Sequence, residues 1–361
     1  MSSTTSPLFK PLKVGNINLQ HRVVLAPLTR YRANEAHVPL LPLVSDYYGQ
    51  RASKPGSLLI TEATFVAARA GGGANVPGIW SVEQIEAWKS ARSFIFMQLW
   101  ALGRAADSAQ LQSEDPTFPY VSASDVALPG RSAPRPLSVS EIKEYLRLYV
   151  QAAKNAIEAG FDGVEIHNAN GYLLDQFLQE ASNNRTDAYG GSIENRARFT
   201  LEVVDAITSA VGSERTAIRF SPWSPFLGMG TVDPIPTFSY VISQLAARHP
   251  DLAYVHLVEP RISGGSTLEV VGEHESNDAL RALWAPRPLI RAGGFSREDA
   301  LKVAESGDLT AFGRHYISNP DLPTRLERNL PLTAYDRSTF FLKGETNPRG
   351  YTDYSFATVS A

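Results

Sequence analysis

The stretch GFDGVEIHNANGYLLDQFL, Gly160–Leu178, places polar groups directly after a short apolar run. GFDGVEI reads as a buried strand, and a long helical pattern precedes it. His167, Asn170 and Tyr172 follow within six residues, and each side chain can donate a hydrogen bond. Parallel α/β folds bind their ligands at the carboxyl ends of strands. The stretch therefore predicts such a strand, with candidate site residues at its end.

Similar apolar runs recur along the whole chain. Continuous runs of this kind are typical of parallel strands that are buried on both faces. The eight runs are Arg22–Pro27, Ser57–Thr64, Ser93–Trp100, Gly163–His167, Thr216–Ser221, Leu252–Val258, Pro288–Ala292 and Leu309–Gly313. Helical patterns lie between them, at Ser138–Ala159, Ile193–Val211, Pro236–Arg248, Asn277–Trp284, Ser296–Glu305 and Asp321–Asn329.

This alternation predicts an α/β fold, a (β/α)8 TIM barrel formed by a single domain over residues 1–361. The alternative is a doubly wound sheet. That fold usually carries GxGxxG after its first strand, and the motif is absent here. The barrel is therefore the favoured fold.

Three segments stand apart from the regular alternation, and one helix within it is short. Leu12–Gln20 predicts a hairpin with a Gly15–Asn16 turn, which we expect to plug the barrel bottom. Ala101–Pro136, a long loop after the third strand, is expected to form a lid on the catalytic face. Tyr335–Phe356 is expected to fold back over the barrel. The helix that begins at the Ser81–Gln84 capping box is expected to end near Ser90, which is short for a barrel helix.

Composition narrows the range of functions. The chain has 361 residues, is 43% hydrophobic and carries a formal net charge of −3 without a long basic run, which disfavours a nucleic-acid partner. Cysteine is absent, which excludes disulfides, thiolate nucleophiles and Cys-ligated metals. No apolar stretch approaches the roughly 18 residues of a membrane span, and the N-terminus lacks a secretory signal. We expect a cytoplasmic protein with no membrane partner.

The strand ends also exclude several chemistries. They contain no lysine for a Schiff base, no set of three metal ligands and no GxSxG motif. The polar groups that remain are neutral donors, two arginines, and glycine turns after the seventh and eighth strands. Barrels commonly bind a phosphate at those turns. This set suits a planar, amide-rich, phosphorylated cofactor.

With these motifs the chain resembles the old yellow enzymes, FMN-dependent ene-reductases built on a TIM barrel. The resemblance extends from about Leu8 to Phe356. The motifs are APLTRYRA (Ala26–Ala33), YYGQRA (Tyr47–Ala52), LITEAT (Leu59–Thr64), QLWALGRA (Gln98–Ala105), EIHNANGYLLDQFL (Glu165–Leu178), RTDAYGGSIENRARF (Arg185–Phe199), HLVEPR (His256–Arg261), AGGF (Ala292–Phe295) and GRHYISNPDL (Gly313–Leu322).

The resemblance implies a role for each candidate site residue. His167 and Asn170 would bind the carbonyl oxygen of an enone, and Tyr172 would donate a proton to the α-carbon. Trp100 and Tyr31 would line the substrate pocket, although core packing is an equal alternative. The residues implied for FMN binding are Pro27, Leu28, Thr29, Ala63, Gln98, Arg219, Gly293, Gly294, Gly313 and Arg314.

Simpler structural explanations stand beside these roles. His167 and Asn170 could cap the next helix, and Tyr172 could be a core aromatic residue. Arg219 could form an internal ion pair with Glu62 or Glu165. We expect RTDAYGGSIENRARF to be structural, with an Arg185–Asp187 pair, a glycine turn and Ser192 as a helix cap.

The function that the resemblance implies is NADPH-dependent reduction of the activated C=C bond of α,β-unsaturated aldehydes or ketones by a ping-pong mechanism, in fungal secondary metabolism. NADH is the alternative donor, and the protein would be a monomer or a homodimer. One alternative function is isomerisation of an unsaturated aldehyde by the same flavin site. Another alternative is a catalytically weak barrel, because the helix after Ser81 is short. Two parts of the sequence near the expected substrate pocket differ from residues that are common in the family, namely Ile262–Thr267 and Phe341. The resemblance therefore does not identify the substrate.

Overall fold

The computed structural model of the protein describes residues 6–89 and 94–358. Its centre is a closed barrel of eight parallel strands, in which β15 pairs with β3. In order around the barrel the strands are β3 (Val23–Leu25), β4 (Leu58–Ile60), β6 (Phe94–Trp100), β9 (Gly163–His167), β10 (Thr216–Phe220), β11 (Tyr254–Val258), β14 (Leu289–Ala292) and β15 (Leu309–Phe312).

The closed barrel confirms the (β/α)8 TIM-barrel prediction and excludes the doubly wound alternative. Each predicted run contains one of the strands, although most strands are shorter than the runs. Ser93, where the third run was expected to begin, lies outside the described residues. Closure pairs each of the eight barrel strands on both sides, so none of them presents an open edge.

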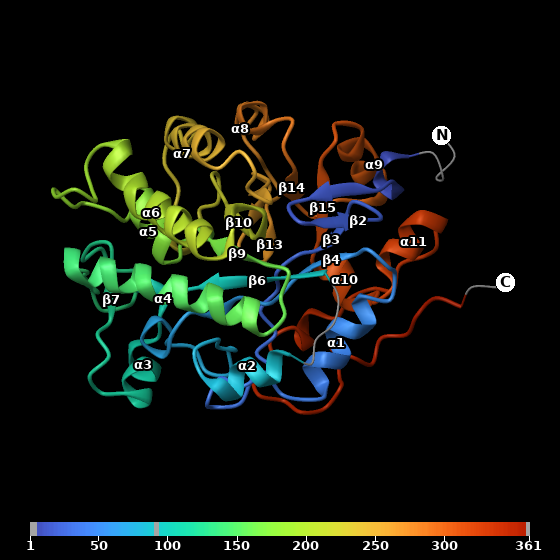
Figure 1. Cartoon of the computed structure of the whole chain (residues 1–361), viewed down its shortest axis with the longest axis horizontal. Coiled ribbons are helices and arrows are strands. Elements are labelled where there is room, and N and C mark those ends of the chain that lie inside the picture. Colours follow the sequence, from blue (N-terminus) through green and yellow to red (C-terminus); the bar gives the residue numbers. More distant parts are fainter. Residues whose placement is uncertain (1–5, 90–93, 359–361) are drawn as a thin grey trace.

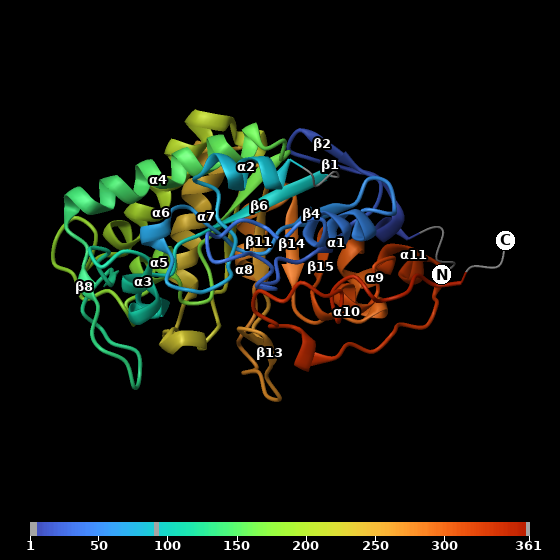
Figure 2. The same cartoon turned by 90° about the horizontal axis from the view of Figure 1, so that it is seen from below.

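Helices surround this barrel, as Figures 1 and 2 show from two directions. The predicted helices are present as α4 (Val139–Glu158), α6 (Ile193–Val211), α7 (Ile235–Arg248), α8 (Asp278–Trp284), α9 (Arg297–Glu305) and α11 (Leu322–Arg328). α4 begins at a complete capping box between Ser138 and Glu141. It buries Ile142, Tyr145 and Tyr149, whose spacing of three and four residues places them on one face.

The sequence patterns missed the short helices. These are α1 (Leu43–Arg51), α3 (Ser108–Glu114), α5 (Leu173–Leu178) and α10 (Arg314–Ser318). Burial does not follow a helical stripe in α5, where all six residues are buried. A helix that is covered on every side lacks the alternation of polar and apolar faces by which a helix is recognised in a sequence.

The short helix after the second strand is α2 (Val82–Trp88). It begins at the predicted capping box of Ser81 and Gln84, and Lys89 ends it. Ser90, near which the end was expected, lies outside the described residues. Trp88 is fully buried, with its ring 5.5 Å from that of Phe161 and 6.2 Å from that of Tyr48.

The N-terminal hairpin closes the barrel bottom as predicted. β1 (Leu12–Val14) and β2 (Ile17–Leu19) pair antiparallel across a turn at Gly15, whose φ is +53°. A side chain at Gly15 would overlap the backbone of Glu214, so the position requires glycine. The hairpin and the barrel interior share one buried cluster, which includes Val14, Ile17, Leu19, Val24, Leu58, Ile60, Phe96 and Ala217.

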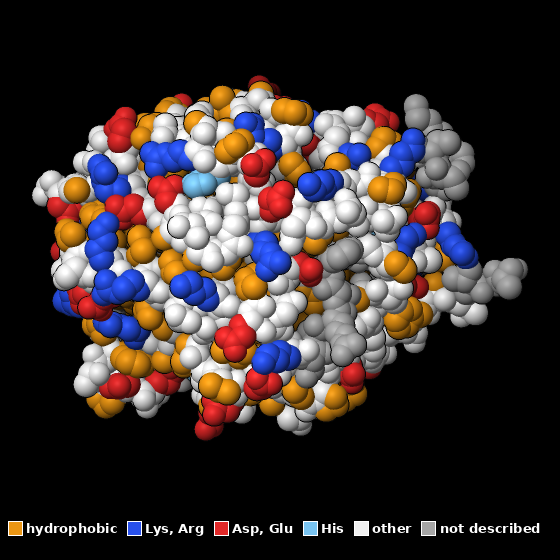
Figure 3. Space-filling view, in the orientation of Figure 1, with side chains coloured by type: hydrophobic (Ala, Val, Ile, Leu, Met, Phe, Trp, Pro, Cys, Tyr) orange, Lys and Arg blue, Asp and Glu red, His pale blue; other side chains and the backbone are white. Residues whose placement is uncertain are grey.

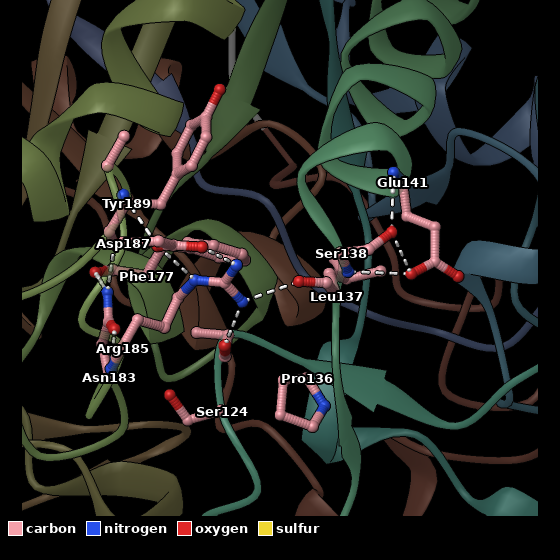
Figure 4. A network of polar contacts seen from close by, with 12 residues as sticks. Ser124, Pro136, Leu137, Ser138, Glu141, Phe177, Asn183, Arg185, Asp187 and Tyr189 are labelled. Carbon is pink, nitrogen blue, oxygen red and sulfur yellow. Dashed lines mark hydrogen bonds and ion pairs between the residues drawn. The ribbon is translucent and has the colours of Figure 1, made fainter.

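The long segment after β6 has structure of its own. It contains α3 and two short strands that pair in parallel, β7 (Val121–Ser122) and β8 (Arg135–Pro136). Arg185 holds it in place, because its Nη1 donates to the carbonyl oxygens of Ala123 (2.8 Å) and Leu137 (2.7 Å), as Figure 4 shows. Asp187 pairs with the same guanidinium and Ser192 caps α6, so the expected structural role of this motif is confirmed.

The surface shows mixed charge. On the face drawn in Figure 3, basic and acidic side chains are interspersed. No helix in the described part of the chain is both long and apolar enough to cross a membrane. Among the same residues, no cluster of three or more histidine, aspartate or glutamate side chains could hold a metal ion.

Candidate active site

The carboxyl ends of the barrel strands open into a cavity of about 540 Å³. This volume is in the range of small-molecule and cofactor sites. Every residue predicted for the site lines this cavity: Pro27, Leu28, Thr29, Ala63, Gln98, Trp100, His167, Asn170, Tyr172, Arg219, Gly293, Gly294, Gly313 and Arg314. The fold thus brings together residues that are far apart in the sequence, such as Pro27 and Arg314, which are 287 positions apart.

Two further segments form the outer wall of the cavity. One is the hairpin of β12 (Ile262–Ser263) and β13 (Ser266–Thr267), and the other is the tail, which contributes Tyr335, Arg337, Phe340 and Phe341. The expectation that the tail folds back is confirmed. The expectation that residues 101–136 form a lid is wrong, because none of them lines the cavity. The long segment packs behind Trp100 and Tyr172, where Leu102 and Tyr120 share their apolar cluster.

Buried arginines hold the tail against the barrel. Arg30 Nη2 donates to the carbonyl oxygen of Gly350 (2.6 Å), and its Nε donates to that of Phe340 (3.1 Å). Arg51 Nη2 donates to the carbonyl oxygen of Tyr351 (3.2 Å). These contacts cross more than 290 residues of sequence, which is why no local pattern showed that Phe340 and Arg337 reach the cavity.

The loop after β9 is held in a left-handed conformation. Asn170 has φ +57° and Gly171 has φ +73°, a region that asparagine and glycine adopt most readily. The backbone amide of Asn170 donates to Ser221 Oγ (2.7 Å), and the backbone amide of Gly171 donates to Asp175 Oδ2 (2.8 Å). Gln176 Nε2 donates to the Gly171 carbonyl oxygen (2.7 Å). These contacts leave the Asn170 side chain free to face the cavity.

The structure does not support the reading of these residues as helix caps. α5 has Tyr172 at its N-cap position and no side-chain cap. The Oδ1 atom of Asn170 and the Nδ1 atom of His167 are both buried and have no partner among the described residues. Buried polar atoms almost always have a hydrogen-bond partner. Both side chains are therefore placed to form hydrogen bonds with a polar ligand in the cavity.

Three rings form one side of the cavity. The Tyr172 ring meets those of Trp100 and His167 edge to face, at centroid distances of 4.7 and 4.9 Å. Burial and the nearby Tyr31 raise the pKa of Tyr172, so its hydroxyl keeps its proton. Burial and the charge of Arg219 lower the pKa of His167 well below its usual value, so the imidazole is neutral. Both side chains can therefore donate hydrogen bonds at neutral pH.

Arg219 stands at the cavity floor without a direct ionic partner among the described residues. Glu62, one expected partner, instead accepts the backbone amides of Arg30 (3.0 Å) and Tyr31 (3.1 Å). Glu165, the other, accepts from Gln98 Nε2 (2.7 Å) and His256 Nδ1 (2.8 Å). The explanation of Arg219 by a direct ion pair is therefore wrong for both carboxylates, and its buried Nε has no partner.

Glycine turns and an arginine lie at the far end of the cavity. Gly293 and Gly294 follow β14, and Gly313 and Arg314 follow β15. Gly294 has φ +63°, and a Cβ there would lie 3.0 Å from Arg314 Nη2. That nitrogen donates to Thr267 Oγ1 (2.8 Å), a neutral partner that a phosphate could replace. The described residues that line the cavity include four arginines and no aspartate or glutamate.

Comparison with known proteins agrees with this geometry. Residues 7–333 match the model of the NADH:flavin oxidoreductase / NADH oxidase family. The chain belongs to this family. Chanoclavine-I aldehyde reductase fgaOx3 of Penicillium roqueforti is 50% identical over 97% of this chain and 96% of its own length. The relative named probable inactive dehydrogenase easA, from Claviceps fusiformis, is 46% identical over 98% of this chain and 95% of its own.

A solved structure confirms the fold of the family member. Old Yellow Enzyme from a Pichia species superposes with a TM-score of 0.89 and 40% identity, covering 98% of this chain and 95% of that one. The protein is thus an NAD(P)H-dependent flavin oxidoreductase of the old yellow enzyme family, with FMN as cofactor. The residues present fit FMN, because unpartnered polar atoms, glycine turns and arginines line one cavity.

Proposed function

We propose that this protein is an ene-reductase that uses NADPH to reduce the activated C=C bond of α,β-unsaturated aldehydes or ketones. The observation that carries the proposal is the placement of His167, at the end of β9, and of Asn170 and Tyr172, directly after it, in the lining of one cavity. The relative named as an aldehyde reductase supports an aldehyde as the carbonyl group and a role in fungal secondary metabolism.

His167 and Asn170 would bind the carbonyl oxygen of the substrate. Negative charge grows on that oxygen when the β-carbon is reduced, and fixed donors stabilise it. Loss of one such donor typically costs about 2.7–4 kcal/mol of barrier. A neutral His167 donates one N–H without bringing a second positive charge next to Arg219. FMN, when bound, carries the reducing equivalents from the nicotinamide to the β-carbon.

Tyr172 would supply the proton to the α-carbon. Its raised pKa keeps the hydroxyl protonated over the working pH range, which a general acid requires. The edge-to-face contacts with Trp100 and His167 fix the direction of the ring. The carbonyl donors and the proton donor thus lie side by side, as addition across an enone demands.

The sequence supports a ping-pong order, in which both substrates use the same cavity. The chain lacks the GxGxxG motif of a separate dinucleotide-binding domain. NADPH and the enone would therefore occupy the same open face in turn. Whether NADPH is preferred over NADH is tested by comparing the two donors at equal concentration.

Two alternatives remain open to test. An isomerase would use the same site to take up and return the reducing equivalents, with no net consumption of NADPH. The hydroxyl of Tyr172 favours net reduction, because it can trap the product by protonation. A catalytically weak barrel is favoured by the short α2 and by the relative named probable inactive.

One anaerobic titration separates these possibilities. The purified protein is expected to show a flavin spectrum that bleaches on addition of NADPH and recovers on addition of cyclohexenone, with the saturated ketone as product. A flavin that stays reduced while an added unsaturated aldehyde is converted to an isomer would favour the isomerase. A colourless protein that FMN cannot reconstitute would refute the proposal and favour the weak barrel.

A further inference from the structure

A buried carboxylate lies beneath the cavity floor, and the proposed reaction does not use it. Glu165, on β9, has no exposed surface. Its Oε1 accepts from Gln98 Nε2 at 2.7 Å and its Oε2 accepts from His256 Nδ1 at 2.8 Å. Both partners lie on other barrel strands, β6 and β11. A carboxylate inside a barrel is costly unless it is fully hydrogen-bonded, so its presence calls for an explanation.

The strand register places this carboxylate beside Gln98 and one layer from Arg219. Gln98 is opposite Glu165 across β6 and β9, and Arg219 is opposite both His167 and His256 across β10. Partners in register on neighbouring strands point to the same side, which here is the barrel interior. Glu165 therefore lies one layer below Arg219, and Gln98 stands beside it.

The carboxylate is ionised in this setting. Burial alone would raise the pKa of Glu165, but the charge and hydrogen bond of His256, the charge of Arg219 and the hydrogen bond from Gln98 together hold it below its usual value. The hydrogen bond from Gln98 does not depend on the charge of the histidine. The negative charge of Glu165 in turn favours the charged form of Arg219.

We propose that Glu165 is a positioning residue that sets the reduction potential of bound FMN, by fixing the Gln98 amide and by partly offsetting the charge of Arg219. The inference rests on the proposed placement of Gln98 and Arg219 against the cofactor. An ionised Glu165 requires Nε2 of Gln98 to point at it, which directs the Gln98 carbonyl oxygen away from the carboxylate. Reduction adds negative charge to the flavin, and a nearby carboxylate opposes that charge.

The test is the reduction potential of FMN in the Glu165→Gln variant, measured by anaerobic dye equilibration without substrate. Glutamine keeps the shape and removes the charge. We expect the equilibrium constant for two-electron reduction to rise at least tenfold, about 30 mV. Asp308→Asn is the control, because Asp308 is buried and paired with Arg281 (2.6 Å) outside the cavity. This control is expected to leave the potential unchanged.

A second variant makes the test decisive if the first loses FMN. Arg219→Gln alone is expected to lower the reduction potential of FMN. Adding Glu165→Gln to that variant is expected to raise the potential again, with at least a tenfold increase in the equilibrium constant for two-electron reduction. An unchanged potential in both backgrounds would overturn the inference, and so would loss of FMN from both variants with the Asp308 control intact. A shifted potential in an enzyme that does not reduce enones would keep this inference and refute the proposed function.

Discussion

Replacement of Tyr172 by phenylalanine tests the assigned proton donor most directly. The change removes one hydroxyl and keeps the ring that packs against Trp100 and His167 at 4.7 and 4.9 Å. Tyr172 lines the cavity, and the packing of its ring does not depend on the hydroxyl. We therefore expect the free energy of unfolding to change by no more than about 0.5 kcal/mol. Any large kinetic effect would then come from chemistry and not from folding.

The expected effect is confined to one half of the catalytic cycle. A general acid typically contributes about 10²–10⁴-fold, which corresponds to roughly 2.7–5.4 kcal/mol of barrier. Reoxidation of the reduced enzyme by cyclohexenone is therefore expected to slow at least 100-fold. Reduction by NADPH transfers no proton from this hydroxyl and is expected to stay within about twofold of the parent. Both rates are measured by anaerobic stopped-flow absorbance of the flavin.

A matched control distinguishes the proton donor from a general disturbance of the cavity. Tyr335, on the tail, also lines the cavity, and its ring lies 5.7 Å from that of Phe340. Tyr335→Phe removes a hydroxyl from the same cavity, but from the tail and not from the loop after β9. It is expected to leave both half-reactions unchanged. Equal losses in the two half-reactions of Tyr172→Phe, or an equal loss in the control, would refute the assignment.

Three further predictions concern the same structure. Replacing His167 and Asn170 together with alanine is expected to abolish the charge-transfer band that phenols form with the flavin, and an undiminished band would remove both from the ligand site. Gly294→Ala is expected to weaken FMN binding roughly 10-fold or more by fluorescence titration. Its Cβ would lie 3.0 Å from Arg314 Nη2 and displace that guanidinium, and loss of a hydrogen bond to a charged group costs about 1.5–3 kcal/mol. Gly130→Ala, at φ +75° in open space, carries the same left-handed backbone strain and is expected to spare FMN affinity. Burial raises the pKa of Asp175 to about 7, so the folded protein binds this proton more tightly than the unfolded chain does. The melting temperature is therefore expected to fall as pH rises from about 4 to 7. Asp175→Asn is expected to flatten that part of the melting-temperature profile, and an unaltered profile would contradict the prediction.

The sequence alone determined the strands, the longer helices and the residues of the inner site. Barrel strands are buried on both faces, so each appears as an apolar run whose end is visible in the sequence. Thr29 follows such a run, Gln98 lies near the end of one and His167 ends one, and parallel strands bring their carboxyl ends together. A local pattern could therefore predict a site whose members are far apart in the chain.

Only the tertiary structure decided which residues of the tail form the outer wall of the cavity and how the charges balance beneath the cavity floor. The tail reaches the cavity because Arg30 and Arg51 bind carbonyl oxygens some 300 residues away, and backbone carbonyls leave no trace in a sequence. The long segment after β6 looked like a lid, but Arg185 holds it beside the barrel. Whether Glu165 contacts Arg219 or Gln98 depends on the register between neighbouring strands, which hydrogen bonds across the sheet fix and which no single strand contains.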